Sequence, residues 1–350
     1  KVKKKVKKMK KTLSSEYSMS DTLTCKEMWS KVDGYDDISL TNYKSLVKYI
    51  NPFTGKVKDE FVTYRDRCPI GGSKNFKYLF TKHGFDHMMC NDTGTIFTLQ
   101  VLSGDAKKEF LQGSESSGDD AEEGNNYGKT KTEGTLSKMD RIKFSLSMDS
   151  IIKHSEIEIK DIFDFGSAAG TFVEWAQEKG YNIIGHEYHK PLRKFCTDRG
   201  LNMLNDDLET IKLDKQYDLI TCWDYVDHLH NPVDIINNIS KYLKPGGLFF
   251  FAINNIDSLV VKIMHEQSPT FIGPHHSVHF GINNLNILMK DYSLLHSESY
   301  VSELNWISNW CNWDNPEFGN TPLMHNIFNA KKICADGLGF KLNAIYKKDK

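Results

Sequence analysis

The sequence predicts an α/β protein whose main domain is a doubly wound, mostly parallel sheet of seven strands. From about Met139 onward, short apolar runs of strand length alternate with amphipathic runs of helix length. The first apolar run also ends at a glycine-rich turn, as the strands of such sheets often do. Because strands that alternate with helices pair in parallel, with helices covering both faces, this pattern favours a doubly wound sheet.

The individual elements follow in chain order. Strands are expected at 161–165, 181–185, 201–204, 217–223 and 248–253, with 294–300 and 340–346 as two more. A helix over 171–179 presents one apolar face and is followed by Gly180, which suits the position after a helix C-terminus. A second helix carries Val233, Ile236, Ile239 and Leu243 on one face, and Lys-Pro-Gly-Gly at 244–247 is expected to close it.

Composition limits the class of protein. With 350 residues, 39% hydrophobic and 26% charged, the chain has the composition of an ordinary soluble protein with a sizeable core. No run approaches the roughly 18 apolar residues of a membrane-spanning helix, and no apolar segment follows the lysine-rich start as in a secretory signal. The seven scattered cysteines favour a reducing compartment. We therefore expect a cytoplasmic protein without a transmembrane segment.

Charge and polarity divide the chain into four parts. We expect a basic disordered tail at 1–24, an aromatic-rich domain at 25–102, a flexible polar linker at 103–138 and the main domain at 139–350. Eight lysines stand in the first 12 residues, which leaves 37 basic against 46 acidic residues elsewhere. An acidic body disfavours nucleic acid as a partner. The tail itself could contact RNA or an anionic membrane, or could simply be a solvated end.

The glycine-rich turn after the first strand is the strongest signal for a ligand. Gly166 lets the chain turn sharply, and Gly170 lets a ligand approach the N-terminus of the next helix. Dinucleotide-binding folds use such a turn as well. However, alanines at 168 and 169 leave no complete Gly-x-Gly-x-x-Gly motif for a pyrophosphate. A nucleoside without phosphates fits better than a dinucleotide.

Two acids further along the chain fit the same ligand. Glu187 follows the second strand, where its carboxylate could accept hydrogen bonds from both ribose hydroxyls. Asp207 follows the third strand and could accept from the amino group of adenine. Together with the glycine-rich turn, they predict an adenosine-binding edge on the sheet.

These motifs resemble those of class I S-adenosylmethionine (SAM)-dependent methyltransferases, a Rossmann-like family, from Asp161 to about Leu288. The matching pieces are Asp164-x-Gly166-x-x-x-Gly170, His186-Glu187, Asp206-Asp207-Leu208-Glu209, Asp218-Leu-Ile220, Asp227-His228-Leu-His-Asn-Pro232 and Leu243-Lys-Pro-Gly-Gly247. Each piece alone is weak, but their order and spacing together are specific.

The resemblance implies S-adenosyl-L-methionine as the cofactor and gives its residues roles. Its methionine end would lie against Asp164, Gly166, Ser167 and Gly170, its ribose against Glu187, its adenine against Asp207 and Leu208, and Asp224 would lie beside it. Where the family commonly has glycine, this chain has Ala168, whose methyl group should crowd the loop and weaken binding.

A second resemblance covers the N-terminal segment. Cys68-Pro-Ile-Gly71 and Cys90-Asn-Asp-Thr93 resemble two zinc-ribbon knuckles that have each lost the second cysteine. Some methyltransferases that act on nucleotide-linked sugars carry such a ribbon ahead of the catalytic domain. Two thiolates do not complete a closed zinc site. We therefore expect a degenerate zinc-ribbon-like domain without metal, although His83 or His87 could supply further ligands.

The motif Gly273-Pro-His-His-Ser-Val-His279 contains the candidate catalytic residues, His275 and His276. In the sugar methyltransferases that the chain resembles, a Glu-His pair after the fifth strand serves acid–base chemistry, and His276 matches that histidine. An imidazole suits proton removal from a hydroxyl. The alternative is that these histidines only order a loop. His228 is a weaker candidate, expected to brace the turn after the fourth strand.

The resemblance therefore favours methyl transfer to a small molecule, most simply a sugar, a glycan, or another hydroxyl or carbon acceptor. The catalytic core alone would suit a quinone or phenol equally well. Two alternatives stay open: a catalytically inert binding scaffold, or a methyltransferase that acts on a macromolecule. The sequence indicates no oligomeric state.

Overall fold

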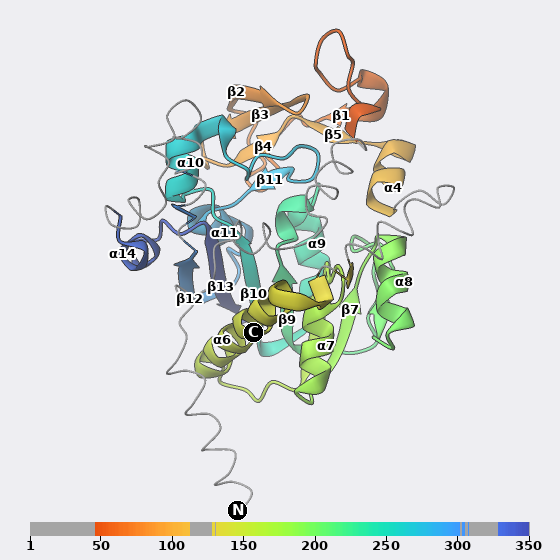
Figure 1. Cartoon of the computed structure of the whole chain (residues 1–350), viewed down its shortest axis with the longest axis vertical. Coiled ribbons are helices and arrows are strands. Elements are labelled where there is room, and N and C mark those ends of the chain that lie inside the picture. Colours follow the sequence, from red (N-terminus) through yellow and green to blue (C-terminus); the bar gives the residue numbers. More distant parts are fainter. Residues whose placement is uncertain are drawn as a thin grey trace, which may run out of the picture.

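The main domain is built on a sheet of seven strands in the order β12-β13-β10-β9-β6-β7-β8 (Figure 1). The computed structural model describes residues 46–112, 128–129, 131–301, 303–304, 307 and 328–349. The strands are β6 (Asp161–Phe165), β7 (Asn182–His186), β8 (Met203–Leu204), β9 (Tyr217–Trp223), β10 (Leu243–Asn254), β12 (Ser293–Tyr300) and β13 (Lys341–Lys347).

The sheet is mixed, which refines the expected mostly parallel arrangement. The five strands from β10 to β8 pair in parallel, whereas β13 runs antiparallel to both β10 and β12. The Lys-Pro-Gly-Gly segment lies inside β10, at a register shift between Leu243 and Leu248. The expectation that the preceding helix continues to Leu243 and closes at this segment is wrong. The helix ends at Ile239, Leu243 begins β10, and the glycines form an irregularity within the strand.

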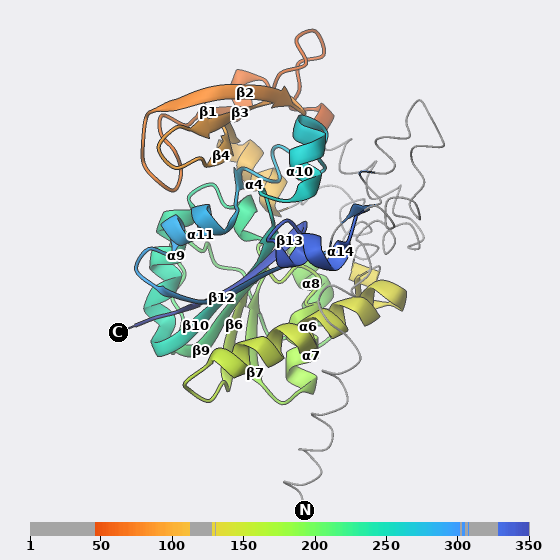
Figure 2. The same ribbon diagram turned by 90° about the vertical axis from the view of Figure 1, so that its left-hand side faces the viewer.

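Helices cover both faces of the sheet (Figure 2). On one face lie α6 (Gly134–His154), α7 (Thr171–Glu178) and α8 (Lys190–Asp198), and on the other lie α9 (Pro232–Ile239) and α11 (Ile282–Leu288). Each face has its own apolar core, with Phe172, Trp175 and Phe250 on the first side and Ile236, Phe249 and Phe251 on the second. The doubly wound architecture is thus confirmed.

The N-terminal segment forms two small sheets above the main sheet in Figure 1. One contains β1 (Val62–Tyr64) and β5 (Gln100–Leu102), and the other has the order β11-β4-β3-β2, with β2 (Phe76–Lys82), β3 (Phe85–Cys90), β4 (Ile96–Thr98) and β11 (Val278–His279). Strand β11 thus brings the histidine motif into the N-terminal sheet, although it lies far along the chain.

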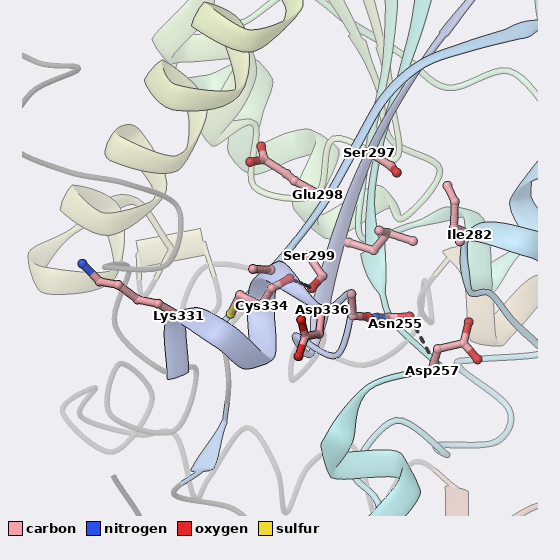
Figure 3. A pocket seen from close by; sticks show the side chains of 12 residues that line it. Asn255, Asp257, Ile282, Ser297, Glu298, Ser299, Lys331, Cys334 and Asp336 are labelled. Atoms are coloured by element: carbon pink, nitrogen blue, oxygen red, sulfur yellow. Dashed lines mark hydrogen bonds between the residues drawn. The ribbon is translucent and has the colours of Figure 1, made fainter. Parts of the chain in front are cut away.

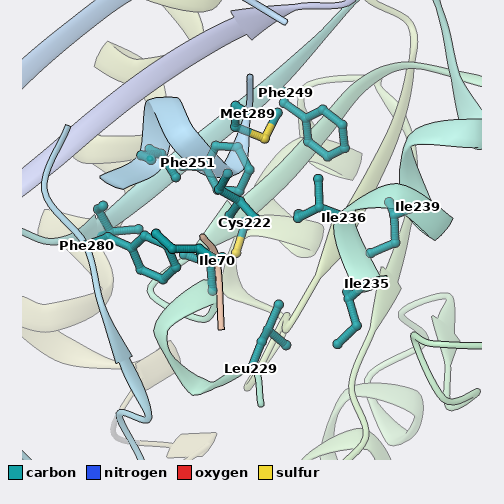
Figure 4. Close-up of a cluster of buried hydrophobic side chains, with 14 of the residues drawn as sticks. Ile70, Cys222, Leu229, Ile235, Ile236, Ile239, Phe249, Phe251, Phe280 and Met289 are labelled. Carbon is teal, nitrogen blue, oxygen red and sulfur yellow. The ribbon is translucent and has the colours of Figure 1, made fainter. Parts of the chain in front are cut away.

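A continuous apolar core joins the two parts. Ile70 of the N-terminal segment packs in the same cluster as Cys222 of β9 and Phe280, beside β11 (Figure 4). The N-terminal sheets therefore fold onto the main domain instead of standing apart from it, because the cluster buries apolar surface from both.

The remaining elements are helices and 3₁₀ turns, and one of the helices lies in the expected linker. The segment expected to be a flexible linker, 103–138, contains helix α4 (Gly104–Gln112) and the start of α6. The other helices are α10 (Leu259–Met264), α14 (Ala330–Ala335) and the 3₁₀ turns η2 (Asp59–Phe61), η3 (Val226–His228), η4 (Ser240–Tyr242) and η5 (His265–Gln267). The expected tail, 1–24, lies outside the described residues. In the described part of the chain, no helix is long and apolar enough to cross a membrane.

Cys68 and Cys90 begin two equivalent turns. In each, the cysteine carbonyl accepts from a glycine four residues later, Gly72 or Gly94, at 2.9 Å. The Cys68 sulfur lies 3.6 Å from the Thr93 hydroxyl, so the second turn reaches over to the first. A ribbon-like origin of this segment stays a prediction, as does the loss of its metal.

Candidate cofactor and acceptor site

The turn between β6 and α7 needs both of its glycines. Gly166 and Gly170 have φ angles of +73° and +70°. A Cβ atom at Gly166 would lie 2.1 Å from the ring of Tyr225, and one at Gly170 would lie 2.6 Å from Leu201. Conformation and close packing both exclude a side chain. At Gly170 the limit comes from core side chains, and not from a ligand as expected from the sequence.

Ala168 lies between these glycines and also has a positive φ, +47°. A residue with a Cβ atom pays roughly 1 kcal/mol or more for this left-handed conformation. Besides the crowding expected from its methyl group, the backbone angle is a separate physical reason why glycine suits this position.

Glu187 holds the glycine-rich turn from the end of β7. Its Oε2 atom accepts from the Ala168 amide at 2.8 Å, and its Oε1 atom accepts from the His189 amide at 2.7 Å. The side chain is buried, and this burial raises its pKa. Each oxygen keeps a further lone pair, so the carboxylate can also accept from ligand hydroxyls.

Asp164 lies beneath the turn rather than at its surface. Its carboxylate accepts from the Thr221 hydroxyl of β9 at 2.6 Å, and the Ser167 hydroxyl donates to its carbonyl at 2.9 Å. Only 1% of Asp164 is exposed, and burial raises its pKa to about 7. Asp164 and Ser167 therefore hold the turn in shape from within.

A cavity of about 260 Å³ opens at the carboxyl ends of β7, β8 and β9. Asp207 and Leu208 line it, together with Tyr225 and His228 from the segment after β9. Asp207 is exposed, and one of its oxygens accepts from the Glu209 amide at 2.9 Å. The two predicted adenine residues thus border one cavity beside the glycine-rich turn.

Asp224 follows β9 with a φ of +54° and pairs with a residue from the far end of the chain. The Lys341 ammonium donates to Asp224 and to the side-chain oxygen of Asn254, both at 2.7 Å. Burial alone would raise the pKa of Asp224, but Lys341 and Lys143 lower it to about 2. Asp224 is therefore a fixed negative charge at this edge of the sheet.

A cluster of Asp227, His228 and His276 lies next to this pair. His276 Nδ1 lies 2.7 Å from the Thr270 carbonyl, and because a carbonyl only accepts, Nδ1 carries a proton. His276 Nε2 lies 3.7 Å from Asp227 Oδ2, and His228 Nε2 lies 3.8 Å from Asp227 Oδ1. Asp227 Oδ1 is buried and has no hydrogen-bond partner.

This cluster could also hold a metal ion. One ligand atom from each of the three side chains lies within 4.8 Å of the others, and no other such group of three occurs among the described residues. Two imidazoles and one carboxylate are a known donor set for divalent transition metals. The cluster therefore has two chemical uses, proton transfer and metal binding.

His275 lies in a different environment from His276. Its ring packs against Phe110 of α4, with ring centroids 4.7 Å apart. Burial lowers its pKa to about 3, and its Nε2 atom is buried without a hydrogen-bond partner. Of the two predicted catalytic histidines, the structure brings His276 alone into the group with Asp227 and His228.

A larger cavity, of about 580 Å³, lies between α14, the edge strand β12 and its neighbour β13 (Figure 3). Asp257, Glu298 and Asp336 are among its lining residues. The buried Asn255 amide at its wall already donates to the carbonyls of Gly337 and Gly339. None of the predicted site residues lines this cavity, so the chemistry is better sought at the smaller one.

Comparison with known protein families agrees with this geometry. Residues 140–310 match the family described as a methyltransferase domain. This segment includes the glycine-rich turn, the smaller cavity's acids and the histidine cluster. This part of the chain therefore resembles a methyltransferase domain.

Curated relatives are similar to about a third of the chain. A ubiquinone biosynthesis O-methyltransferase of Hydrogenovibrio crunogenus is 27% identical over 118 residues, which cover 31% of this chain and 49% of the relative. One from Erwinia tasmaniensis is 28% identical over 135 residues, 36% of this chain and 55% of the relative. The chain thus spans about half the length of these relatives.

Solved structures of similar fold include SAM-dependent methyltransferases. One from Clostridium acetobutylicum has 12% identity and a TM-score of 0.43, and the match covers 64% of this chain and 98% of the Clostridium chain. One from Archaeoglobus fulgidus has 19% identity and a TM-score of 0.42, with coverages of 59% and 94%.

The methyltransferase domain has side chains that fit SAM. The lone pairs left on buried Glu187 suit ribose hydroxyls, and exposed Asp207 suits an amino group at the mouth of the cavity. Asp224 supplies a fixed negative charge, which suits a cationic cofactor.

Sequence reasoning missed several residues of the methyltransferase domain's site. Lys341 reaches Asp224 from β13 and also donates to Asn254 at the end of β10, and Tyr225 covers Gly166. Asn254 accepts from Lys341 and donates to Asp227. Lysine and asparagine carry no motif at these positions, so no local pattern could have indicated either residue. Tyr225 directly follows the predicted site residue Asp224. An aromatic residue at that position was the one sequence feature that could have indicated a role for Tyr225.

Proposed function

We propose that this chain methylates a hydroxyl group of a small-molecule acceptor, with His276 as the general base. The observation that carries the proposal is the proton on His276 Nδ1, fixed by the Thr270 carbonyl. In the neutral ring this leaves an unprotonated Nε2 that lies 3.7 Å from Asp227 Oδ2. A proton acceptor with a carboxylate beside it suits a hydroxyl that becomes a nucleophile, because the carboxylate favours the protonated ring.

In the proposed reaction each residue has a separate role. SAM, when bound, supplies a methyl group already activated on a sulfonium cation. Glu187, Asp207 and Leu208 hold the nucleoside, and Asp224 supplies a negative charge beside the cation. His276 Nε2 takes the acceptor's hydroxyl proton while Asp227 stabilises the resulting imidazolium. Alignment of acceptor and cofactor provides much of the remaining acceleration.

The acceptor class rests on two observations. The curated relatives with similar sequence are O-methyltransferases, which supports a hydroxyl acceptor. The paired turns at Cys68 and Cys90 support a nucleotide-linked sugar or glycan hydroxyl, through the ribbon-like segment of sugar methyltransferases. An acceptor screen should therefore begin with nucleotide sugars and continue with phenols and quinols.

The test combines binding and turnover. Calorimetry with SAM and S-adenosylhomocysteine should show binding to the wild type and, equally, to a His276→Gln variant. With the acceptor found in the screen, His276→Gln should lower kcat by about 10²- to 10⁴-fold. Binding without methylation of any hydroxyl compound, or full turnover by His276→Gln, would contradict the proposal.

The geometry of the cluster favours a second candidate, in which Asp227, His228 and His276 hold a divalent metal that positions the acceptor oxygen. Turnover measured after chelation separates the two. A base mechanism keeps its rate in the chelator, whereas a metal mechanism loses it and regains it when Mg²⁺ or Zn²⁺ is added back.

A further inference from the structure

Arg65, directly after β1, reaches from the N-terminal segment into the main domain. Its Nη1 donates to the Thr98 carbonyl at 2.8 Å and to the Ser277 carbonyl at 3.2 Å. Its Nη2 donates to the His230 carbonyl at 2.8 Å and lies 3.4 Å from the Ser277 hydroxyl. One guanidinium thus joins three chain segments: the N-terminal sheet, the turn after β9 and the histidine motif.

Ser277 connects the same segments from the other side. Its amide donates to the Asp227 carbonyl at 2.8 Å, and its hydroxyl donates to the Leu229 carbonyl at 3.0 Å. Its own carbonyl accepts from the Thr98 amide at 3.0 Å. Because Ser277 directly follows His276, these bonds tie the backbone of the proposed base to that of Asp227.

The environment of Arg65 is costly for a cation. Burial lowers its pKa to about 9. The acceptors that the structure gives its guanidinium are carbonyl and hydroxyl oxygens. A desolvated charge without a carboxylate partner costs stability unless all its donors are used. The planar fork of arginine holds its donors in a fixed geometry, whereas the ammonium of lysine is a compact point charge on a flexible stem.

We propose that Arg65 and Ser277 act as a clamp that positions His276 relative to Asp227, so that the N-terminal segment is part of the reaction machinery. The proposal rests on the proposed role of His276. Neither clamp residue contacts the reacting atoms, so both are positioning residues. Strand β11, which follows Ser277 and pairs with β4, anchors the motif on the other side.

The test compares Arg65→Gln and Arg65→Lys with a matched control, Arg67→Gln. Arg67 lies two residues away and is exposed, and it pairs with Asp66. We expect Arg65→Gln to lower kcat by about 10- to 100-fold, with KM and the calorimetric Kd for S-adenosylhomocysteine changed by less than about threefold. Arg65→Lys should recover only part of the rate, because it reaches fewer carbonyls. Arg67→Gln should behave as the wild type.

An independent readout separates this clamp from the proposed function. In ¹⁵N-edited spectra of the full chain, the His276 Nδ1 proton that is bonded to Thr270 should give a shifted or exchange-broadened signal in Arg65→Gln, and an unchanged one in Arg67→Gln. This measurement needs no acceptor. If His276→Gln leaves turnover intact, the proposed function fails, yet the spectrum still tests the clamp.

Two results would overturn the clamp. One is an unchanged His276 signal in a folded Arg65→Gln protein. The other is a loss of S-adenosylhomocysteine binding in parallel with kcat, which would make Arg65 a general structural residue. If Arg65→Gln does not fold, Ser277→Ala provides the same test, because it removes only the hydroxyl contacts and keeps the amide bond to Asp227.

Discussion

The two halves of the site are built in different ways. The nucleoside half takes its side chains from one stretch, 164–208, where each residue follows the end of a strand or begins the next turn. The histidine half joins Arg65, Asp227, Asn254, His276 and Lys341 from five distant segments. The first half depends on local turn geometry, whereas the second depends on how distant parts of the fold meet.

The acidic side chains of the two halves also lie in different environments. Asp164 and Glu187 are buried among neutral donors, and burial raises the pKa of both. Asp224 lies among lysines, which lower its pKa. Local hydrogen bonds therefore support the nucleoside half, and a long-range ion pair supports the other. Each prediction below tests one side of this contrast.

The largest effect is expected at Asp164. Its pKa in the folded protein, about 7, lies above the unfolded value of 3.8, so the folded state binds more protons between these pH values. The free energy of unfolding should therefore fall as the pH rises from 4 to 7, by up to about 4 kcal/mol for this group. Urea unfolding of Asp164→Asn should show this fall removed, since asparagine stays neutral.

The matched control for this titration is Asp198→Asn, which changes an exposed acid paired with Lys194. It should keep the wild-type pH dependence. A wild-type protein whose stability relative to Asp164→Asn stays constant from pH 4 to pH 8 would show that Asp164 is ionised throughout.

The next effect concerns Glu187. Replacing it with alanine leaves the Ala168 and His189 amides without their acceptor and removes the proposed ribose contact. We expect the calorimetric Kd for SAM to rise about 100-fold, equivalent to two charge-assisted bonds at roughly 1.5 kcal/mol each. Glu209→Ala, at the rim of the same cavity, should change it by less than threefold. If Glu187→Ala and Glu209→Ala weakened SAM binding equally, the ribose would not be bound by Glu187.

This contrast explains how far the sequence could predict the molecule. The glycine turn, Glu187 and Asp207 could be found because a parallel sheet brings consecutive strand ends to one edge. Lys341 could not, because its role depends on β13 inserting antiparallel beside β10, which no periodicity indicates. Likewise, β11 has two residues, too few for an alternating pattern, yet it attaches the histidine motif to the N-terminal sheet.

A smaller effect is expected in the histidine half of the site, at Lys341. Lys341→Met leaves Asp224 without its ammonium partner, and the pair is partly exposed, so we expect a loss of about 1–2 kcal/mol at pH 7. The folded pKa of Asp224, about 2, lies below the unfolded 3.8. Its stabilisation is therefore complete above pH 3.8 and lost as the pH falls through 2.

Acid unfolding measures this contribution. Wild type and Lys341→Met should differ at pH 6 and converge toward pH 2. Lys347→Met, at the other end of β13 and paired with Glu156, serves as the control and should show little change at pH 6. A constant difference between wild type and Lys341→Met at all pH values would mean that lost packing of the lysine stem, and not its charge, caused the destabilisation.

The smallest effect is expected at Ala168, where the nucleoside half departs from its own local rules. Ala168→Gly relieves a left-handed conformation at φ +47° but adds backbone freedom to the unfolded chain. With roughly 1–2 kcal/mol relieved and 0.5–1 kcal/mol lost, a net gain of about 0.5–1 kcal/mol in unfolding free energy remains. The Glu187 bond uses the backbone amide of residue 168 and survives the change. If Ala168→Gly raises the urea midpoint and leaves the Kd for SAM unchanged, backbone strain is the only effect of the alanine. If the variant binds SAM more tightly, the methyl group also crowds the cofactor.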